Sequence, residues 1–259
     1  MALAVGLTVA TAAIGWAVVK ALDGGARVID PKPPVTVYVE TDPAKVFAGH
    51  PEWQTYDFVS PASASDFGRP PARCREWRTR ARRADGVDAD ETHAHAYLQG
   101  TPGAAVVIDG IEVEILRRRP PIRGTSAHCP AGGAVGNPRL IDVDLDADPP
   151  EVLYAEAGDD YPARRRLNFT LTDAESDTFR LRAHTTRCDC TWRARVQMVV
   201  NDQRMQLTLD EDGEPFRTSA SAAARHVAWN GRRWAPMARA DWMQTLPVDW
   251  AKFVREQRR

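Results

Sequence analysis

One stretch of the sequence, from Cys188 to Val200, constrains the fold more than any other. Apolar side chains occupy every second position in it: Cys188, Cys190, Trp192, Ala194, Val196, Met198 and Val200. This spacing matches the two-residue period of a β-strand and not the 3.6-residue period of a helix. A strand with one apolar face has to bury that face, so we expect a β-sheet over a hydrophobic core.

Shorter stretches show the same period and are separated by turn signals. Asp109-Gly110 and Asn230-Gly231 lie between apolar runs and predict hairpins, the first with a type I′ turn, and Asn201-Asp202 ends the long strand. The other alternating apolar sets are Val35/Val37/Val39, Ala94/Ala96/Leu98, Ile141/Val143/Leu145, Leu167/Phe169/Leu171, Phe179/Leu181/Ala183 and Met205/Leu207/Leu209. About eight strands with short turns predict a mainly β domain, either an antiparallel sandwich or an open barrel.

Two helices are expected beside the strands. Residues 71–84 place Cys74, Trp77 and Ala81 on one face and are followed by Gly86, so this helix should pack on a sheet through Trp77. The residues from 247 onward predict a short amphipathic C-terminal helix.

An N-terminal hydrophobic segment, residues 2–19, precedes the predicted domain. It contains no charge and no proline, and at about 1.5 Å per residue a helix of this length just crosses a bilayer core. A cleaved signal peptide is the alternative, but the segment lacks a basic n-region and no clear cleavage motif follows it. We therefore expect a transmembrane anchor (1–22) that contacts the lipid bilayer through residues 2–19, then a stalk rich in Gly and Pro (23–34) and a β-rich domain (35–259).

Two signals disagree on the side of the membrane that the domain occupies. Lys20, Arg27 and Lys32 follow the hydrophobic segment, and counted literally the positive-inside rule puts the domain in the cytoplasm. Four cysteines in a β-rich domain are instead typical of an oxidising compartment. We give the cysteines more weight and expect a single-pass protein of the cell membrane with an extracytoplasmic domain.

The balance of charge argues against one class of partner. The chain has 34 Lys and Arg against 35 Asp and Glu, so no overall field attracts nucleic acid. The arginine clusters at 80–83, 117–119 and 164–166 have acidic residues close by and are interpreted as solvated faces. A protein or a component of the cell envelope is the expected partner, and nucleic acid is not.

The four cysteines are candidates for disulfide bonds. Cys188 and Cys190 should point to the apolar face beside Trp192, with too little chain between them for an easy mutual bridge. We therefore predict a bridge from Cys129 to one of them, while Cys74 pairs with the other or stays free. Such a bridge would close a loop of about sixty residues, which the chain-entropy model values at roughly 4 kcal/mol.

Metal binding offers alternative interpretations of three patterns. Zinc could be held by all four cysteines, or by three of them together with His128, although a single C-x-C is weak evidence for zinc. His93 and His95 on one strand face could share a metal, but no third ligand follows at a recognisable spacing. Asp142 to Asp148 resembles the opening of a calcium loop without its glycine and closing glutamate, so a strand with outward aspartates is favoured. We predict no metal or cofactor site.

Catalytic motifs are missing from the sequence. It contains no G-x-S-x-G, S-x-x-K or H-x-x-E-H pattern and no paired carboxylates in a cleft-forming context. This favours a binding or interaction module of unknown ligand over an enzyme, and an extracytoplasmic hydrolase is the rival function.

Several pieces of the chain resemble uncharacterised proteins of high-GC Gram-positive bacteria, a family of unknown function in which a membrane segment precedes a β-rich domain. The resembling pieces are 104–110, 119–124, 143–146, 188–192 and 212–219. Some relatives carry a helix-turn-helix domain ahead of the membrane segment, which would put their β domain outside the cell. The resemblance implies an anchored extracytoplasmic module and no activity that can be assigned to particular residues.

Overall fold

A computed structural model describes residues 33–46, 55–69, 77–130, 139–156, 162–165, 167–171, 175–229 and 232–237. Contacts divide the chain between Pro33 and Pro34, and every element named below belongs to the unit Pro34–Arg259. Among the described helices, none combines the length and the hydropathy that crossing a bilayer requires. The hydrophobic segment 2–19 and the expected C-terminal helix lie outside the described residues, so both stay predictions.

The described chain is mainly β, with two sheets and little helix, which confirms the prediction of a mainly β domain. Sheet A has the strand order β1 (Val35–Glu40), β4 (Glu91–Gly100), β10 (Ser176–His184), β7 (Arg139–Asp144) and β8 (Glu151–Ala155). Sheet B has the order β15 (Trp234–Pro236), β14 (Arg225–Trp229), β6 (Thr125–Pro130), β2 (Thr55–Ser60), β3 (Val87–Ala89), β13 (Phe216–Ser219), β11 (Asp189–Val200), β5 (Val106–Arg119) and β9 (Phe169–Leu171). A further strand, β12 (Gln203–Leu209), pairs with β11. The described helices are α1 (Pro43–Val46), η1 (Ala64–Phe67) and α2 (Trp77–Arg83).

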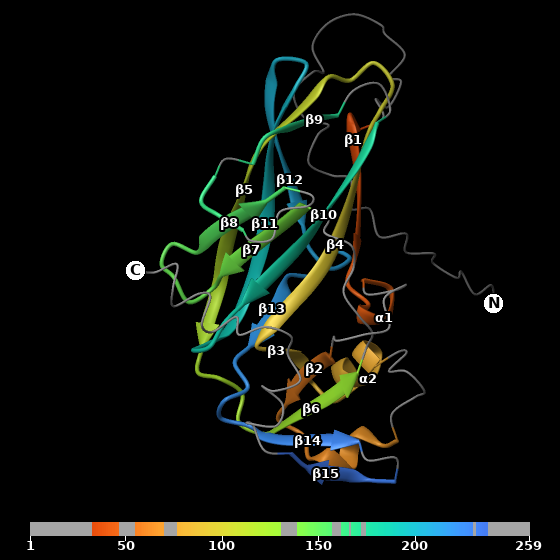
Figure 1. Ribbon diagram of the computed structural model, residues 1–259, viewed down its shortest axis with the longest axis vertical. Helices are drawn as coiled ribbons and strands as arrows, with labels where there is room; N and C mark the ends of the chain where they lie inside the picture. Colours follow the sequence, from red (N-terminus) through yellow and green to blue (C-terminus); the bar gives the residue numbers. More distant parts are fainter. Residues whose placement is uncertain are drawn as a thin grey trace, which may run out of the picture. The chain divides into compact units, whose positions relative to one another are not determined.

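The main core lies between the two sheets, in a sandwich-like arrangement (Figure 1). The predicted apolar positions of β4, β10, β7 and β11 all point into it, because alternate residues of a strand share one face. Trp192 is fully buried at its centre, where its indole Nε1 donates a 2.9 Å hydrogen bond to Thr218 Oγ1. Each large apolar side chain buried in this way contributes about 1.5–3 kcal/mol to stability.

Two predictions about strand pairing are wrong. Three pairs, β10 with β7, β14 with β6 and β13 with β3, are parallel, so the sheets are mixed and not purely antiparallel. Asp109-Gly110 does not turn the chain back, since β5 continues through it to Arg119. Gly110 faces Gln197 and Ile108 faces Met198, which leaves Asp109 as the extra residue of a β-bulge.

The other two turn signals agree with the structure. Asn201 and Asp202 both have positive φ, 47° and 67°, and join β11 to β12 in the tight turn expected there. Trp229 faces Trp234 across β14 and β15, so these strands form the expected hairpin, but with the four-residue connection 230–233 and not a two-residue turn. Asn230 and Gly231 lie outside the described part of the chain.

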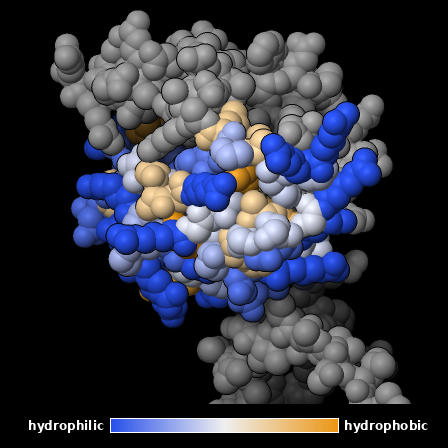
Figure 2. Space-filling model, turned by 90° about the horizontal axis from the view of Figure 1, so that it is seen from below, coloured by the Kyte–Doolittle hydropathy of each residue, from blue (hydrophilic) through white to orange (hydrophobic). Residues whose placement is uncertain are grey.

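A second, smaller core lies at the end of the unit where β2, β6, β14 and α2 meet (Figure 1). Phe58 packs edge-on against Phe67 with ring centroids 4.9 Å apart, and Phe67 meets Trp234 in the same way at 6.0 Å. Figure 2 looks onto this end and shows hydrophilic side chains around a small group of apolar ones. The visible part of this end therefore carries no extended apolar surface.

Helix α2 is described from Trp77 to Arg83, and residues 71–76, over which the sequence predicts its first turns, lie outside the described part of the chain. Ala81 is buried as predicted, while the side chain of Trp77 is also outside the description. The amide of Gly86 donates to the carbonyl of Ala81 at 2.7 Å and so ends the helix. A Cβ at Gly86 would lie 2.7 Å from that carbonyl oxygen, which explains the glycine.

Arg78 connects α2 to the rest of the unit. Its guanidinium group bonds both carboxylate oxygens of Glu211, at 3.1 and 3.0 Å, and lies 3.3 Å from Asp88. It also donates to the carbonyl of Thr41 at 2.7 Å. Arg78 is only 8% exposed, so this cluster holds the helix, β3 and the segment after β12 together away from solvent.

Candidate functional site

The two histidines that the sequence singles out lie on the outer face of sheet A. His93 and His95 alternate along β4 with Ala94 and Ala96, which point into the core and are each 1% exposed. This confirms the predicted orientation of the strand. A group of three or more residues able to hold a metal is not found among the described residues.

Strand register shows what surrounds these histidines. His93 faces Arg182 of β10, and His95 faces Arg180 on one side and Glu40 of β1 on the other. Alternate residues of β4 from Glu91 to Tyr97 and of β10 from Thr178 to His184 therefore form one continuous surface. We call this surface, with Tyr38 and Glu40 on β1 and Asp142 on β7, the polar face of sheet A.

Most charges on the polar face are neutralised by near neighbours. Arg182 Nε donates to Asp142 Oδ1 at 2.6 Å, and His184 Nε2 lies 3.6 Å from the other oxygen of that carboxylate. Burial alone would raise the pKa of Asp142, but Arg182 and His184 outweigh it and hold this pKa well below its usual range. His93 Nε2 lies 2.9 Å from Glu91 Oε1. Burial would likewise raise the pKa of Glu91, which His93 and Arg182 instead hold at about 2.

Arg180 differs from its neighbour Arg182. Within the described part of the chain it makes no ion pair, and its Nε is withdrawn from solvent without a hydrogen-bond partner. Burial lowers the pKa of Arg180, and the charge of Arg182 lowers it further, whereas Glu91 and Asp142 have only a weaker opposite effect. A guanidinium group stays protonated under such conditions, so Arg180 carries a positive charge without an ion-pair partner among the residues that the structure describes.

His95 directly faces Arg180 and also has a buried ring nitrogen, Nε2, without a partner among the described residues. Burial, and then the charge of Arg180, lower the pKa of His95, so the imidazole is neutral at pH 7. Its Nδ1 lies 3.2 Å from the hydroxyl of Tyr97. If Tyr97 donates to Nδ1, the proton of His95 is on Nε2 and can be donated to a ligand.

Two tyrosines border this pair. Tyr38 and Tyr97 face each other across β1 and β4 with ring centroids 5.9 Å apart, and are 57% and 41% exposed. The Tyr38 hydroxyl donates to Glu40 Oε2 at 2.7 Å, so both rings are held by a hydrogen bond on the same surface. Exposed aromatic rings of this kind are common in binding sites because they give a large contact area at low cost in side-chain entropy.

One signal in the sequence points to Arg180 and Arg182. Phe179, Leu181 and Ala183 are the predicted inward positions of this strand, so the residues between them had to point outward. What the sequence could not show is that β10 lies beside β4, which places Arg180 opposite His95.

A second polar cluster lies in sheet B, at positions of β2, β6 and β14 that alternate with the residues of the small core. His128 Nδ1 is 2.9 Å from Asp57 Oδ1, and His128 Nε2 is 3.0 Å from His226 Nδ1, with the two imidazole rings stacked. All three side chains are buried, with residue exposures between 4% and 8%. The cluster joins β2, β6 and β14, and both ring nitrogens of His128 are occupied by neighbours.

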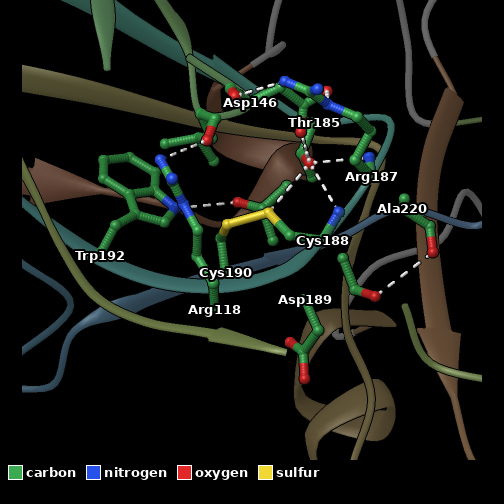
Figure 3. The surroundings of a disulfide bond; sticks show 12 residues. Arg118, Asp146, Thr185, Arg187, Cys188, Asp189, Cys190, Trp192 and Ala220 are labelled. Atoms are coloured by element: carbon green, nitrogen blue, oxygen red, sulfur yellow. Dashed lines mark hydrogen bonds and ion pairs between the residues drawn. A yellow bond between two sulfur atoms is a disulfide. The ribbon is translucent and has the colours of Figure 1, made fainter. Parts of the chain in front are cut away.

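The structure joins Cys188 to Cys190 in a disulfide, so the predicted bridge from Cys129 to this strand is wrong (Figure 3). Residues two apart in a regular strand are separated by about 6.6 Å, but Cys188 precedes β11, and the Cα atoms of the two cysteines are 5.4 Å apart. Both cysteines are buried beside Trp192, as predicted. Cys74 and the side chain of Cys129 lie outside the described residues.

The same disulfide bears on the zinc alternative. Zinc is bound by thiolates, and in this form neither Cys188 nor Cys190 is one. The hydroxyl of Thr185 lies 3.1 Å from Cys188 Sγ, and Arg118 donates to the carbonyls of Leu145 and Ala147 close by (Figure 3). These contacts fix the start of β11 against the loop after β7.

The aspartates after position 141 do not form a calcium loop. Ile141, Val143 and Leu145 point into the core, as the strand interpretation predicts. Asp142 is buried against Arg182, and Asp146 accepts hydrogen bonds from Thr185 and Thr186. Each of these two carboxylates thus binds a neighbouring side chain.

Comparisons of the chain with family models, with curated proteins and with solved structures find no match.

Proposed function

We propose that the domain 35–259 is an extracytoplasmic binding module, anchored by residues 2–19, and that the polar face of sheet A binds an anionic group of its ligand. The observation that carries this proposal is Arg180, whose Nε has no hydrogen-bond partner among the described residues, beside the Nε2 of His95. Anchor and compartment rest on the sequence, and the binding surface rests on the geometry described above.

An uncompensated charge withdrawn from water is costly unless it gains a partner. Burying an ion is unfavourable by several kcal/mol, and an anion bound from outside would recover part of that cost. Arg182 shows what satisfies a guanidinium on this face, since Asp142 lies 2.6 Å from it. A carboxylate or phosphate group on the ligand would take the corresponding place for Arg180.

His95 adds a neutral donor to this arrangement. Because its pKa is lowered, its contribution to anion binding is a hydrogen bond and not a charge. A site with one permanent cation and one neutral donor should hold an anion over a wide range of pH above the pKa of the ligand.

The rival function, an extracytoplasmic hydrolase, draws on the Asp57–His128 pair, which has the geometry of an acid that orients a general base. His128 uses its second nitrogen on His226, and the three side chains are almost completely buried. The contacts favour a role in holding β2, β6 and β14 together.

Arginine signals of the full chain, purified in a non-ionic detergent and labelled with ¹⁵N only at arginine, test the proposal. Titration with sodium acetate and with inorganic phosphate at constant ionic strength should shift the Nε–Hε signal of Arg180 in a saturable way. The variant Arg180→Gln should lose this response, and Arg204→Gln, at an exposed position of β12, should keep it. If the signals of Arg180 and Arg204 respond equally, or neither responds, the proposal is wrong.

A further inference from the structure

We infer that the ligand of the polar face is an acidic saccharide, whose ring stacks on Tyr97 and Tyr38 while its carboxylate binds Arg180. This inference rests on the proposed function, because it identifies the molecule that carries the anionic group. It adds the two tyrosines, which the binding of a simple anion does not require.

Tyr38 and Tyr97 are unusually exposed for aromatic side chains of this protein. Among the described residues, the large apolar or aromatic side chains that stay exposed are Tyr38, Tyr97 and Leu116. Two of these three are direct neighbours on the same face, next to Arg180 and His95. One face of a sugar ring is covered by C–H groups, which pack on an aromatic ring, while its hydroxyl groups stay at the edge in reach of polar side chains.

The spacing between Tyr97 and Arg180 fits a sugar ring that carries a carboxylate. Tyr97 and Arg180 are diagonal neighbours on adjacent strands, a relationship that separates side chains by about 7–8 Å. A six-membered ring stacked on Tyr97 therefore brings an attached carboxylate within reach of Arg180 and of His95 Nε2. Thr178, which faces Tyr97 on β10, offers a hydroxyl group at the edge of the same ring.

The distribution of charge orients the ligand. Glu40, beside Tyr38, accepts hydrogen bonds from the Tyr38 hydroxyl, the amide of Asp42 and Lys45, so its carboxylate stays negative and its pKa is lowered despite burial. The carboxylate of Glu40 would repel a ligand carboxylate on the β1 side of the surface, where Tyr38 also lies. The acidic group of the saccharide thus belongs on the β10 side of the surface, at Arg180, and uncharged hydroxyl groups belong on the β1 side, at Glu40.

The rings are also held in place before any ligand arrives. Tyr38 is fixed by Glu40 and Tyr97 by His95, each through a side-chain hydrogen bond. The His95 ring also packs against Tyr97, with centroids 4.5 Å apart. Such preorganisation reduces the entropy lost on binding and suits an extended ligand that lies flat on the sheet.

Calorimetric titration of the full chain in non-ionic detergent tests the inference, with tetragalacturonate, its methyl ester and inorganic phosphate as probes. The acid should bind, and its ester should bind at least about tenfold more weakly because it cannot form an ion pair with Arg180. Tyr97→Ala should weaken tetragalacturonate binding about tenfold. It should weaken phosphate binding much less, because phosphate loses only the hydroxyl group that orients His95. Arg180→Gln should weaken the binding of both.

Two further variants provide controls. Leu116→Ala removes the third exposed apolar side chain, which lies on β5 in sheet B, and should leave every affinity unchanged. Tyr97→Phe keeps the ring and should retain most of the affinity for the saccharide, which keeps the test valid if Tyr97→Ala does not fold.

The outcomes separate the two proposals. If phosphate binds through Arg180 but tetragalacturonate binds no better, or if Tyr97→Ala has no effect on it, the saccharide inference fails and the anion site stands. If none of the probes binds, or if the ester binds as well as the acid, the role proposed for Arg180 fails as well.

Discussion

Arg78 in α2 and Glu211 after β12 are joined by two parallel hydrogen bonds, Nε to Oε1 and Nη2 to Oε2, at 3.1 and 3.0 Å. Residues 133 positions apart in the sequence thus form a buried bidentate ion pair, to which Asp88 adds a second carboxylate. Pairs of this geometry are strong because the planar guanidinium group matches the carboxylate.

Replacing Arg78 should therefore be severely destabilising. Arg78→Ala leaves the buried Asp88 without its cation and Glu211 with only the more exposed Arg82, which is expected to lower the free energy of unfolding by about 3–5 kcal/mol. Urea denaturation followed by tryptophan fluorescence measures this. Arg83→Ala, at an exposed position of the same helix, is the control and should change stability by less than about 0.5 kcal/mol. Equal effects of the two variants would show that the cluster does not hold the helix.

The backbone around Gly124 predicts a different kind of sensitivity. A Cβ at this position would lie 2.8 Å from Pro61 Cα and closer still to the carbonyl oxygen of Ser60, so backbone has to move. Gly124→Ala should cost about 1–3 kcal/mol. Gly110→Ala has no atom within 4 Å of its new Cβ and should be close to neutral in the same thermal or urea unfolding assay. A neutral Gly124→Ala would mean that this close approach is absent in solution.

The depressed pKa of Asp142 predicts how stability changes with pH. A carboxyl group with a lowered pKa in the folded state stabilises above its unfolded pKa of about 3.9, and this contribution is lost as the pH falls through the folded value. Above pH 5 the wild type should be more stable than Asp142→Asn, and the difference should shrink below pH 4. Unfolding free energies measured from pH 7 to pH 3 check this. Asp202→Asn, at an exposed turn, should follow the wild type throughout, and a parallel loss in Asp142→Asn would contradict the assignment.

The disulfide between Cys188 and Cys190 can be tested by its peptide. Trypsin cuts after Arg187 and Arg193, so both cysteines lie in the single peptide 188–193. Without reduction this peptide should resist alkylation and be lighter by two hydrogens than its dithiol form. Recovery of the peptide cross-linked to one that contains Cys129 would restore the pairing expected from the sequence.

How far the sequence predicts the fold depends on whether a feature is local. The faces of β4 and β11 follow from the two-residue period, since alternate side chains of a strand must point the same way. The bulge at Asp109 could not be distinguished from a hairpin, because Asp-Gly favours both, and the choice depends on the partner strand β11. Likewise, no local pattern shows that β10 lies parallel to β7 and beside β4.

In the candidate site, too, the local features could be predicted from the sequence and those that depend on a neighbouring strand could not. His93 and His95 were identified from their spacing, and the outward direction of Arg180 could have been inferred from its strand. The lack of a partner for Arg180 among the described residues could not be inferred, because it depends on which side chains the neighbouring strands bring close, and these strands are distant in the sequence. The disulfide was missed for a similar reason, as the approach of Cys188 to Cys190 depends on where β11 begins.

The position of β11 has a consequence for the order in which the molecule opens. Asp189 to Trp192 pair with β13 and Ala194 to Val200 pair with β12 on one side, while β5 pairs along the other. Its amide protons should therefore exchange with deuterated solvent only through global unfolding. Within the described part of the chain β15 pairs with β14 alone and should exchange through local fraying, so the small core loosens while β11 and the main core beneath it stay closed.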